Sequence, residues 1–430
     1  MSKAILLKGA VANVLARSAG LVASFLNVFL LGRLFNASEF GLWAWLFSIF
    51  ILVTSQDFGY ISAMRVQIGG TLKSETPSEQ KILYGTAFLM TLAVVASAFV
   101  GVTVYSLIWN ESSSDPLLRN LAILCSVTTI LGTVSAQALL ANLHTATIAL
   151  IEAARSIIQI LIFTLAYFFN WDLTTLVFCF FLTSILYVPL VGKIYVMTTG
   201  WGFNEIFLTV KGNLQKVRVT AVKLLQDGWI LWITQIGMTM LISSDVYLSG
   251  FFLGDEDIAK VNVITRFQLL GVGILGAALT PIIAHFVVQV GDVSKKNAQN
   301  KILLGYFFFF FIGLFYALIF TTWGQTLAQL WSHVDVNKPL VFAYSGVLFF
   351  LMLSVTLMQI FLQFSVISKA LAPWLALLIA IKIGLSQYLV SNYGYIGIFM
   401  ASIFVIAFFL VVSYSLLFKQ GLYERLHATR

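Results

Sequence analysis

The sequence predicts an all-α integral membrane protein with twelve transmembrane helices and both termini in the cytoplasm. Of its 430 residues, 60% are hydrophobic and only 10% are charged, whereas a soluble domain has about 25% charged residues. The mean hydropathy is +0.96. Apolar runs long enough to cross a hydrocarbon core of about 30 Å recur along the whole chain. Basic residues collect in alternate loops between these runs, which orients the chain in the membrane.

Each apolar run is assigned to one spanning helix, because about 20 apolar residues suffice for a helix to cross the bilayer. A closed β-barrel is excluded, since barrel strands are short and alternate between apolar and polar residues. The expected spans are 11–34, 40–66, 83–109, 117–142, 145–169, 174–198, 224–252, 258–289, 302–323, 339–365, 370–390 and 393–418.

The loops after the even-numbered spans, together with the two termini, are basic. They hold Lys3, Lys8, Lys73, Lys81, Lys193, Lys211, Lys216, Arg218, Lys223, Lys295, Lys296, Lys301, Lys369, Lys419, Arg425 and Arg430. The other loops hold Lys260 and Lys338, with Arg33 and Arg119 at the edges of spans. They are mainly acidic, with Glu39, Glu111, Asp115, Asp172, Asp255, Glu256, Asp257 and Asp335. Because basic loops stay in the cytoplasm, both termini and segment 199–222 are placed there.

Several classes of function are disfavoured by the same features. The loops on the acidic side are too short for a catalytic domain, and no glycine-rich phosphate loop is present. The net charge of +8 follows from the basic cytoplasmic loops and does not indicate nucleic-acid binding. The two cysteines lie inside spans, and the four histidines lack the spacing of metal ligands. We therefore expect neither an enzyme nor a cofactor.

A weak internal repeat suggests two lobes. A shift that places Asn27 over Asp245 also places Gly32 over Gly250, and thus the first span over the seventh. Chance similarity of apolar helices is the alternative explanation. With six spans in each half, the expected division is an N-lobe at 1–198, a cytoplasmic linker at 199–222 and a C-lobe at 223–430. Substrate paths in such repeat proteins usually lie between the repeats.

Polar residues recur at helical spacing within several spans. These stripes are Asn13, Arg17, Gly20, Ser24 and Asn27 in the first span, Ser126, Thr129, Thr133 and Gln137 in the fourth, and Glu152, Arg155 and Gln159 in the fifth. The eighth span carries Asn262 and Arg266, and the tenth carries Thr356, Gln359 and Gln363. For the serine and threonine positions, packing between helices is the better explanation of such stripes.

Charges within the spans are the stronger indication of function, because a charge in the bilayer is costly. The candidate substrate-binding residues are Arg17, Arg155, Arg266 and Lys382. Cations gathered around a cavity need an anion, and a phosphate group is the natural candidate. The acids Asp57, Glu152 and Asp245 are candidates for ion coupling, or are counter-ions of the basic residues in structural salt bridges.

The N-terminal part of the chain resembles a known family. The pattern begins with Phe29-Leu30-Leu31-Gly32-Arg33 and Glu39-Phe40-Gly41-Leu42-Trp43, and continues through Asp57-Phe58-Gly59 to Arg65. It resembles the Wzx-type O-antigen and polysaccharide flippases of the multidrug/oligosaccharidyl-lipid/polysaccharide export superfamily. Chain length, span number and topology fit that family throughout.

The resemblance implies a MATE-like fold of two six-helix lobes in the bacterial cytoplasmic (inner) membrane. It also implies a substrate, an undecaprenyl-diphosphate-linked oligosaccharide, that is flipped by alternating access through a basic cavity. Membrane lipids, a polysaccharide polymerase and a chain-length regulator are the partners it implies. Arg155, Arg266 and Lys382 fit this expectation by the kind of position they occupy and not by a motif.

Besides a peptidoglycan-precursor flippase, a kind of protein that is usually longer and has extra helices, two alternatives remain at this point. The first is a cation-coupled multidrug antiporter of the same superfamily, against which the bases within the spans argue mildly. The second is of another class, a membrane-embedded polysaccharide polymerase or glycosyltransferase. The short outward loops and the lack of a compact catalytic cluster in any loop argue against it.

Overall fold

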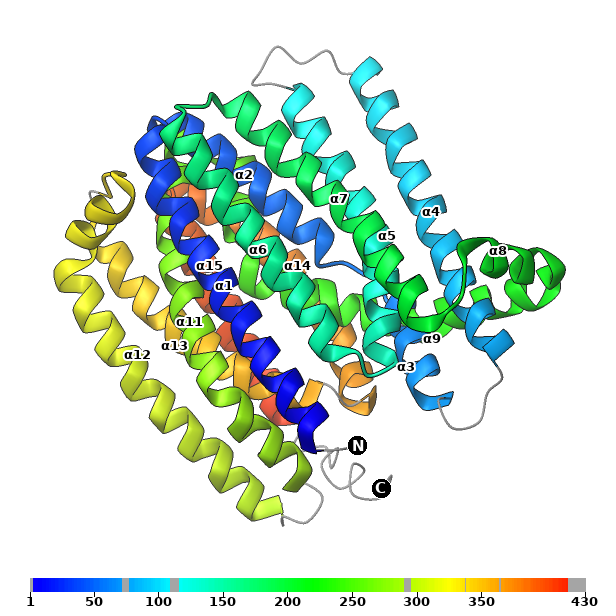
Figure 1. Ribbon diagram of the computed structural model, residues 1–430. Helices are drawn as coiled ribbons and strands as arrows, with labels where there is room; N and C mark the ends of the chain where they lie inside the picture. Colours follow the sequence, from blue (N-terminus) through cyan, green and yellow to red (C-terminus); the bar gives the residue numbers. More distant parts are fainter. Residues whose placement is uncertain are drawn as a thin grey trace. The chain divides into compact units, whose positions relative to one another are not determined.

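The computed structural model describes residues 3–71, 77–108, 116–289, 295–336, 338–362 and 365–416. Over these residues the regular secondary structure is helical, with fifteen α-helices (Figure 1). Their bounds are α1 Lys3–Leu34, α2 Ala37–Thr54, α3 Tyr60–Thr71, α4 Pro77–Ile108, α5 Pro116–Ala141, α6 Thr145–Phe168, α7 Leu173–Thr199, α8 Phe203–Gly212, α9 Leu214–Ser243, α10 Asp245–Phe252, α11 Asp255–Gln289, α12 Lys295–Ser332, α13 Pro339–Leu362, α14 Ser365–Tyr393 and α15 Ile396–Tyr414.

Within the described residues, eleven helices are long and apolar enough to cross a membrane. Each of these helices overlaps one predicted span. Of the twelve predicted spans, the seventh, 224–252, has no such helix. That segment is divided between α9 and α10, which Ser244 separates. α10 has only 8 residues, and the part of α9 after its basic start carries Gln226, Asp227 and Gln235, so neither helix alone has the length and composition of a span. The predicted all-helical membrane protein is confirmed, and its seventh span is interrupted.

Two compact units make up the chain. The first comprises residues 1–23 and 46–235, and the second comprises residues 24–45 and 236–430. In the first unit, α5 packs against α3, α4, α6 and α7, and α8 packs against α4. In the second unit, α13 packs against α11, α12, α14 and α15, and α10 packs against α11, α14 and α15. The lobe boundaries expected from the sequence stay a prediction, and the expected linker 199–222 contains α8 and the start of α9.

The predicted second span, 40–66, is also interrupted, by the loop between α2 and α3. Phe58 and Gly59 have positive φ angles of 51° and 71°, which end the helical path. The Asp57 carboxylate holds the loop by accepting hydrogen bonds from the Gly59 N–H, at 2.8 Å, and from the Ser62 hydroxyl. Gln235 of α9 donates a hydrogen bond to the Ser55 carbonyl. Polar side chains thus satisfy backbone groups that this interruption leaves without helical partners.

Other residues of the N-terminal pattern have structural roles in the second unit. Asn36 and Glu39 cap the start of α2 reciprocally: the Glu39 N–H donates to Asn36 Oδ1, and the Asn36 N–H donates to Glu39 Oε2. Gly41 lies so close to the Asp255 carbonyl that a Cβ atom would stand 1.8 Å from its oxygen. Arg33 donates to carbonyls in the last turn of α12 and lies over the Phe29 ring. These contacts explain why small and basic residues stand here.

Gly59 should tolerate no side chain. Its φ is positive, and a Cβ atom there would lie 1.8 Å from the carbonyl oxygen of Gly228. We expect Gly59→Ala to lower the free energy of unfolding by more than about 1 kcal/mol, seen as a lower thermal midpoint of the purified protein. Gly101→Ala in α4 is the control, because a Cβ there has open space around it. Equal thermal midpoints for Gly59→Ala and the wild type would contradict this account of the interruption.

Candidate functional site

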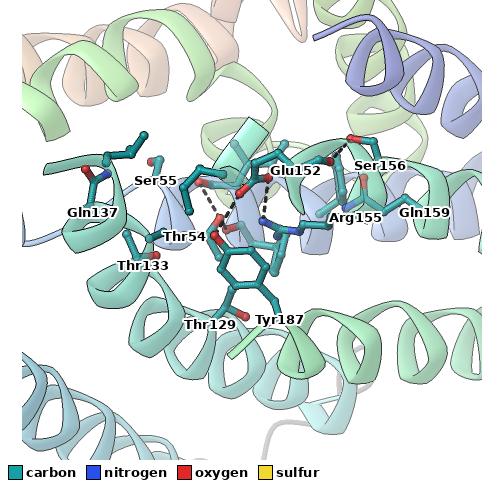
Figure 2. Close-up of a pocket in the computed structure, with 16 residues that line it drawn as sticks. Thr54, Ser55, Thr129, Thr133, Gln137, Glu152, Arg155, Ser156, Gln159 and Tyr187 are labelled. Carbon is teal, nitrogen blue, oxygen red and sulfur yellow. Dashed lines mark hydrogen bonds and ion pairs between the residues drawn. The ribbon is translucent and has the colours of Figure 1, made fainter. Parts of the chain in front are cut away.

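The first unit contains a cavity of about 520 Å³ (Figure 2). Its walls are the second half of α2 with Ser55, the second half of α5, residues 148–159 of α6, and Tyr187 of α7. Polar side chains gather along it, and Figure 2 labels Thr54, Ser55, Thr129, Thr133, Gln137, Glu152, Arg155, Ser156, Gln159 and Tyr187. All of these residues belong to expected membrane spans. The cavity therefore brings hydrogen-bonding groups and charges into a part of the chain that is otherwise apolar.

Two polar stripes noted in the sequence line this one cavity. Thr129, Thr133 and Gln137 lie on α5, and their spacing of four residues keeps them on one helix face. Glu152, Arg155 and Gln159 do the same on α6. The Thr129 hydroxyl donates to the Cys125 carbonyl one turn earlier, at 2.8 Å. This bond to its own helix occupies the hydroxyl donor of Thr129. The amides and the charged groups are therefore the main polar groups available to a ligand in the cavity.

Arg155 is the cation of the cavity. Its guanidinium lies 5.4 Å from the centre of the Phe50 ring and 5.2 Å from that of Tyr187, within the range of cation–π contacts. Its Nη1 is 3.7 Å from Glu152 Oε2, a loose ion pair. Its Nε is buried and has no hydrogen-bond partner among the described residues. The side chain is 24% exposed, so the guanidinium reaches the cavity and keeps donor capacity.

Glu152 is the acid of the cavity and lies one turn before Arg155. Its Oε1 accepts a hydrogen bond of 3.1 Å from the Tyr187 hydroxyl, and its side chain is 42% exposed. The carboxylate is thus held by a tyrosine on one side and faces the arginine on the other, as the dashed lines in Figure 2 show. The cavity offers a cation and an anion side by side, together with uncharged amides.

Two other predicted residues of the first unit do not line this cavity. Arg17 is exposed on α1. Asp57 is buried in the loop between α2 and α3, where the bonds described above engage its carboxylate. Their roles in substrate binding and ion coupling stay predictions.

Lys382 and Asp245 form a buried ion pair in the second unit. Their side chains are 1% and 0% exposed, and Lys382 Nζ lies 2.8 Å from Asp245 Oδ1. The same ammonium donates to the carbonyls of Met240, at 2.9 Å, and Leu241, at 3.1 Å. An ammonium has three N–H donors, and these three acceptors match them. Lys382 therefore neutralises Asp245 and donates to carbonyls at the end of α9, where the helix is interrupted; the Ser244 hydroxyl also donates to the Met240 carbonyl.

Arg266 is also buried, on α11 of the second unit. Its Nε donates to Asn262 Oδ1 over 3.3 Å, one turn away on the same helix. Of the predicted residues, the structure thus pairs Arg155 with Glu152 and Lys382 with Asp245. The cavity of Figure 2 contains only the first pair among its lining residues.

Sequence reasoning missed three contributors to the cavity and its edge. Tyr187 lies in an apolar run, and its signal is a tyrosine hydroxyl deep in a span, which needs a polar partner. Ser55 lies at the end of α2, where the interruption of the helix brings it to the cavity. Arg65 Nη1 donates to Gln137 Oε1 over 3.2 Å, which adds a second guanidinium beside a lining residue.

Comparison with known proteins identifies the fold of the chain but not its family. No protein-family model matches the chain, and no curated protein matches it. Solved structures do match over nearly its full length. An inward-facing multidrug resistance MATE family transporter of the MOP superfamily has a TM-score of 0.66 at 11% identity, covering 98% of this chain and 99% of that one.

Two further structures agree with the first. The lipid II flippase MurJ, in an inward closed conformation, has a TM-score of 0.67 at 14% identity, covering 96% of this chain and 87% of that one. A variant of the Vibrio cholerae MATE transporter VcmN has a TM-score of 0.56 at 14% identity, with coverages of 97% and 98%. At these identities the likeness establishes architecture. The chain is an all-helical membrane protein with the fold that MATE transporters and MurJ share.

Proposed function

We propose that the chain is a flippase, which moves a polyprenyl-diphosphate-linked oligosaccharide across the bacterial cytoplasmic membrane without making or breaking a covalent bond. The observation that carries the proposal is the cavity of Figure 2, with Arg155 beside uncharged hydrogen-bonding groups such as Gln137 and Gln159. A guanidinium suits a phosphate or an acidic sugar, and amides suit sugar hydroxyls. Aromatic side chains such as Phe50 and Tyr187 suit the apolar faces of sugar rings.

The comparisons support a transporter of this kind, since MurJ is described as a lipid II flippase and shares the fold. The resemblance of the N-terminal pattern to Wzx-type flippases points to undecaprenyl diphosphate as the lipid carrier. In the proposed mechanism the lipid tail stays in the bilayer while the polar part enters the chain. Alternating access of two lobes then exposes the sugars to the other side.

A cation-coupled multidrug antiporter is the second candidate, and Glu152 is the observation that favours it. The Glu152 side chain lines the same cavity and is 42% exposed, so its carboxylate is accessible to a cationic drug or a coupling ion. Arg155 opposes that reading because its guanidinium stands 3.7 Å from Glu152 and repels a second cation.

The two candidates differ in what accumulates when the protein is absent. In a strain that lacks the chain, we expect complete lipid-linked repeat units to build up on the cytoplasmic leaflet, with loss of the surface polysaccharide. The measurement is extraction of diphosphate-linked sugars combined with a leaflet-selective labelling assay, and expression of the wild-type chain is the control. Unchanged lipid-linked pools together with increased drug sensitivity would replace the flippase with the antiporter.

A further inference from the structure

The helix α8 and the start of α9 present a surface that the transport cavity does not use. α8 packs against α4 through Ile206 and Val210, which are buried. The contact is close, because a Cβ atom on Gly85 of α4 would lie 2.5 Å from a methyl group of Val210. α8 also exposes Phe207 and Leu208, at 59% and 66%. A short helix that carries charged residues and also exposes large apolar side chains is suited to a membrane interface.

An apolar groove of about 270 Å³ runs between α4 and α8. Its lining includes Phe88, Leu89 and Leu92 from α4, and Phe203 and Phe207 from α8. Leu89 and Leu92 are themselves exposed on α4, a helix long and apolar enough to span the membrane. The groove is therefore continuous with a surface that faces acyl chains. An acyl chain fits it better than a peptide, since the groove offers few polar groups.

A second, polar cavity of about 410 Å³ lies beside the same part of α4. Its lining includes Lys216, Thr220 and Lys223 from α9 and Gln67 from α3. The α4 residue Leu83 lines this cavity, whereas the next residue, Tyr84, lines the apolar groove. The two spaces thus adjoin the same turn of α4.

The charge of this region is complementary to an anionic headgroup. Its exposed cations are Lys211, Lys216, Arg218 and Lys223. The neighbouring acids are mostly engaged: Glu205 pairs with Lys81, and Asp227 accepts a 3.0 Å hydrogen bond from Gln67. Glu79 also lines the polar cavity, together with Lys216 and Lys223. The balance is positive, on the side that the sequence assigns to the cytoplasm, where basic residues attract anionic lipids.

We infer that α4, α8 and the start of α9 form a binding site for an anionic glycerophospholipid. Its phosphate lies by Lys216 and Lys223, and one acyl chain lies in the groove between α4 and α8. This lipid is distinct from the transported substrate, because none of these residues lines the cavity of Figure 2. Its binding holds α8 against α4, and so stabilises the first unit on the side expected to be cytoplasmic.

The test is lipid binding by the full-length chain, and it needs no transport assay. The purified protein is titrated with phosphatidylglycerol or phosphatidylcholine, and retained lipid is measured by native mass spectrometry together with the thermal midpoint. We expect phosphatidylglycerol to be retained and to raise the midpoint more than phosphatidylcholine. The double variant Lys216→Gln/Lys223→Gln should bind phosphatidylglycerol about tenfold to thirtyfold more weakly. Lys193→Gln, an exposed lysine of α7 outside both spaces, should bind it like the wild type.

Two further measurements distinguish binding of a lipid from binding of other anions. Phe207→Ser should weaken phosphatidylglycerol binding while leaving its dependence on salt unchanged, because it removes apolar contact and no charge. Equal binding of the two lipids, or unchanged binding by the double lysine variant, would overturn the inference. Stabilisation by inorganic phosphate alone, as large as that by phosphatidylglycerol, would also overturn it and leave a plain anion site.

Discussion

Replacing Lys382 by alanine should destabilise the protein more than any other single substitution considered above. The change removes the ammonium and leaves the Asp245 carboxylate, which is 0% exposed, without its ion-pair partner. It also leaves the Met240 and Leu241 carbonyls without the donor that they share. Breaking a buried pair in this way costs about 3–5 kcal/mol. We expect a lower thermal midpoint and less folded protein in the membrane fraction.

A double substitution of Lys382 and Asp245 distinguishes a structural role of Lys382 in the ion pair from a role in substrate binding. Lys382→Met together with Asp245→Asn removes both charges, and Ser402 still has a side-chain oxygen to which it can donate. We expect the double variant to recover much of the stability that Lys382→Ala loses. Lys369→Ala, at an exposed position on the same helix, should have no effect. A Lys382→Ala protein that is stable but inactive would instead favour the predicted role of Lys382 in substrate binding.

Replacing Arg155 by alanine should have the largest effect on transport. A hydrogen bond to a charged group contributes about 1.5–3 kcal/mol, which corresponds to roughly a ten- to hundredfold loss of transport rate at low substrate concentration. Folding should suffer little, because the guanidinium is held by a loose ion pair of 3.7 Å and by two cation–π contacts, and its Nε has no hydrogen-bond partner among the described residues. The measurement is flipping of a diphosphate-linked oligosaccharide in proteoliposomes, normalised to the amount of folded protein.

Two substitutions control this experiment. Arg155→Lys keeps the charge but loses the planar fork of donors, so it should restore transport in part if the substrate group is a phosphate or carboxylate. Lys193→Ala, at an exposed position of the same unit outside the cavity lining, should transport like the wild type. Wild-type rates for Arg155→Ala would remove the cavity of Figure 2 from the proposed path.

Helical periodicity explains how much of the site the sequence could predict. Residues Thr129, Thr133 and Gln137 share a face of any helix that contains them, and so do Glu152, Arg155 and Gln159. The sequence could therefore find both stripes, but it could not show that they face one cavity. Which helix faces meet depends on the packing of α2, α5, α6 and α7, whose cavity residues run from Phe47 to Tyr187.

The same distinction applies to the interrupted helices and the charges. Apolar length alone predicts the spanning segments, because every backbone polar group in a bilayer has to be satisfied within a helix. The interruptions at Ser244 and between Thr54 and Tyr60 are not predicted in this way. There, side chains from other parts of the chain satisfy backbone carbonyls at the helix ends. Gln235 does so for Ser55, and Lys382 does so for Met240 and Leu241.

By itself, the sequence thus determined the class of protein, the places of eleven of its twelve expected spans among the described residues, and the polar face of two of them. Only the tertiary structure decided that Lys382 forms a buried ion pair with Asp245, whereas Arg155 lines an open cavity. The reason is physical: composition and periodicity are properties of neighbouring residues. The partner of a buried charge is set instead by which distant helix packs against it, and Lys382 and Asp245 lie on α14 and α10.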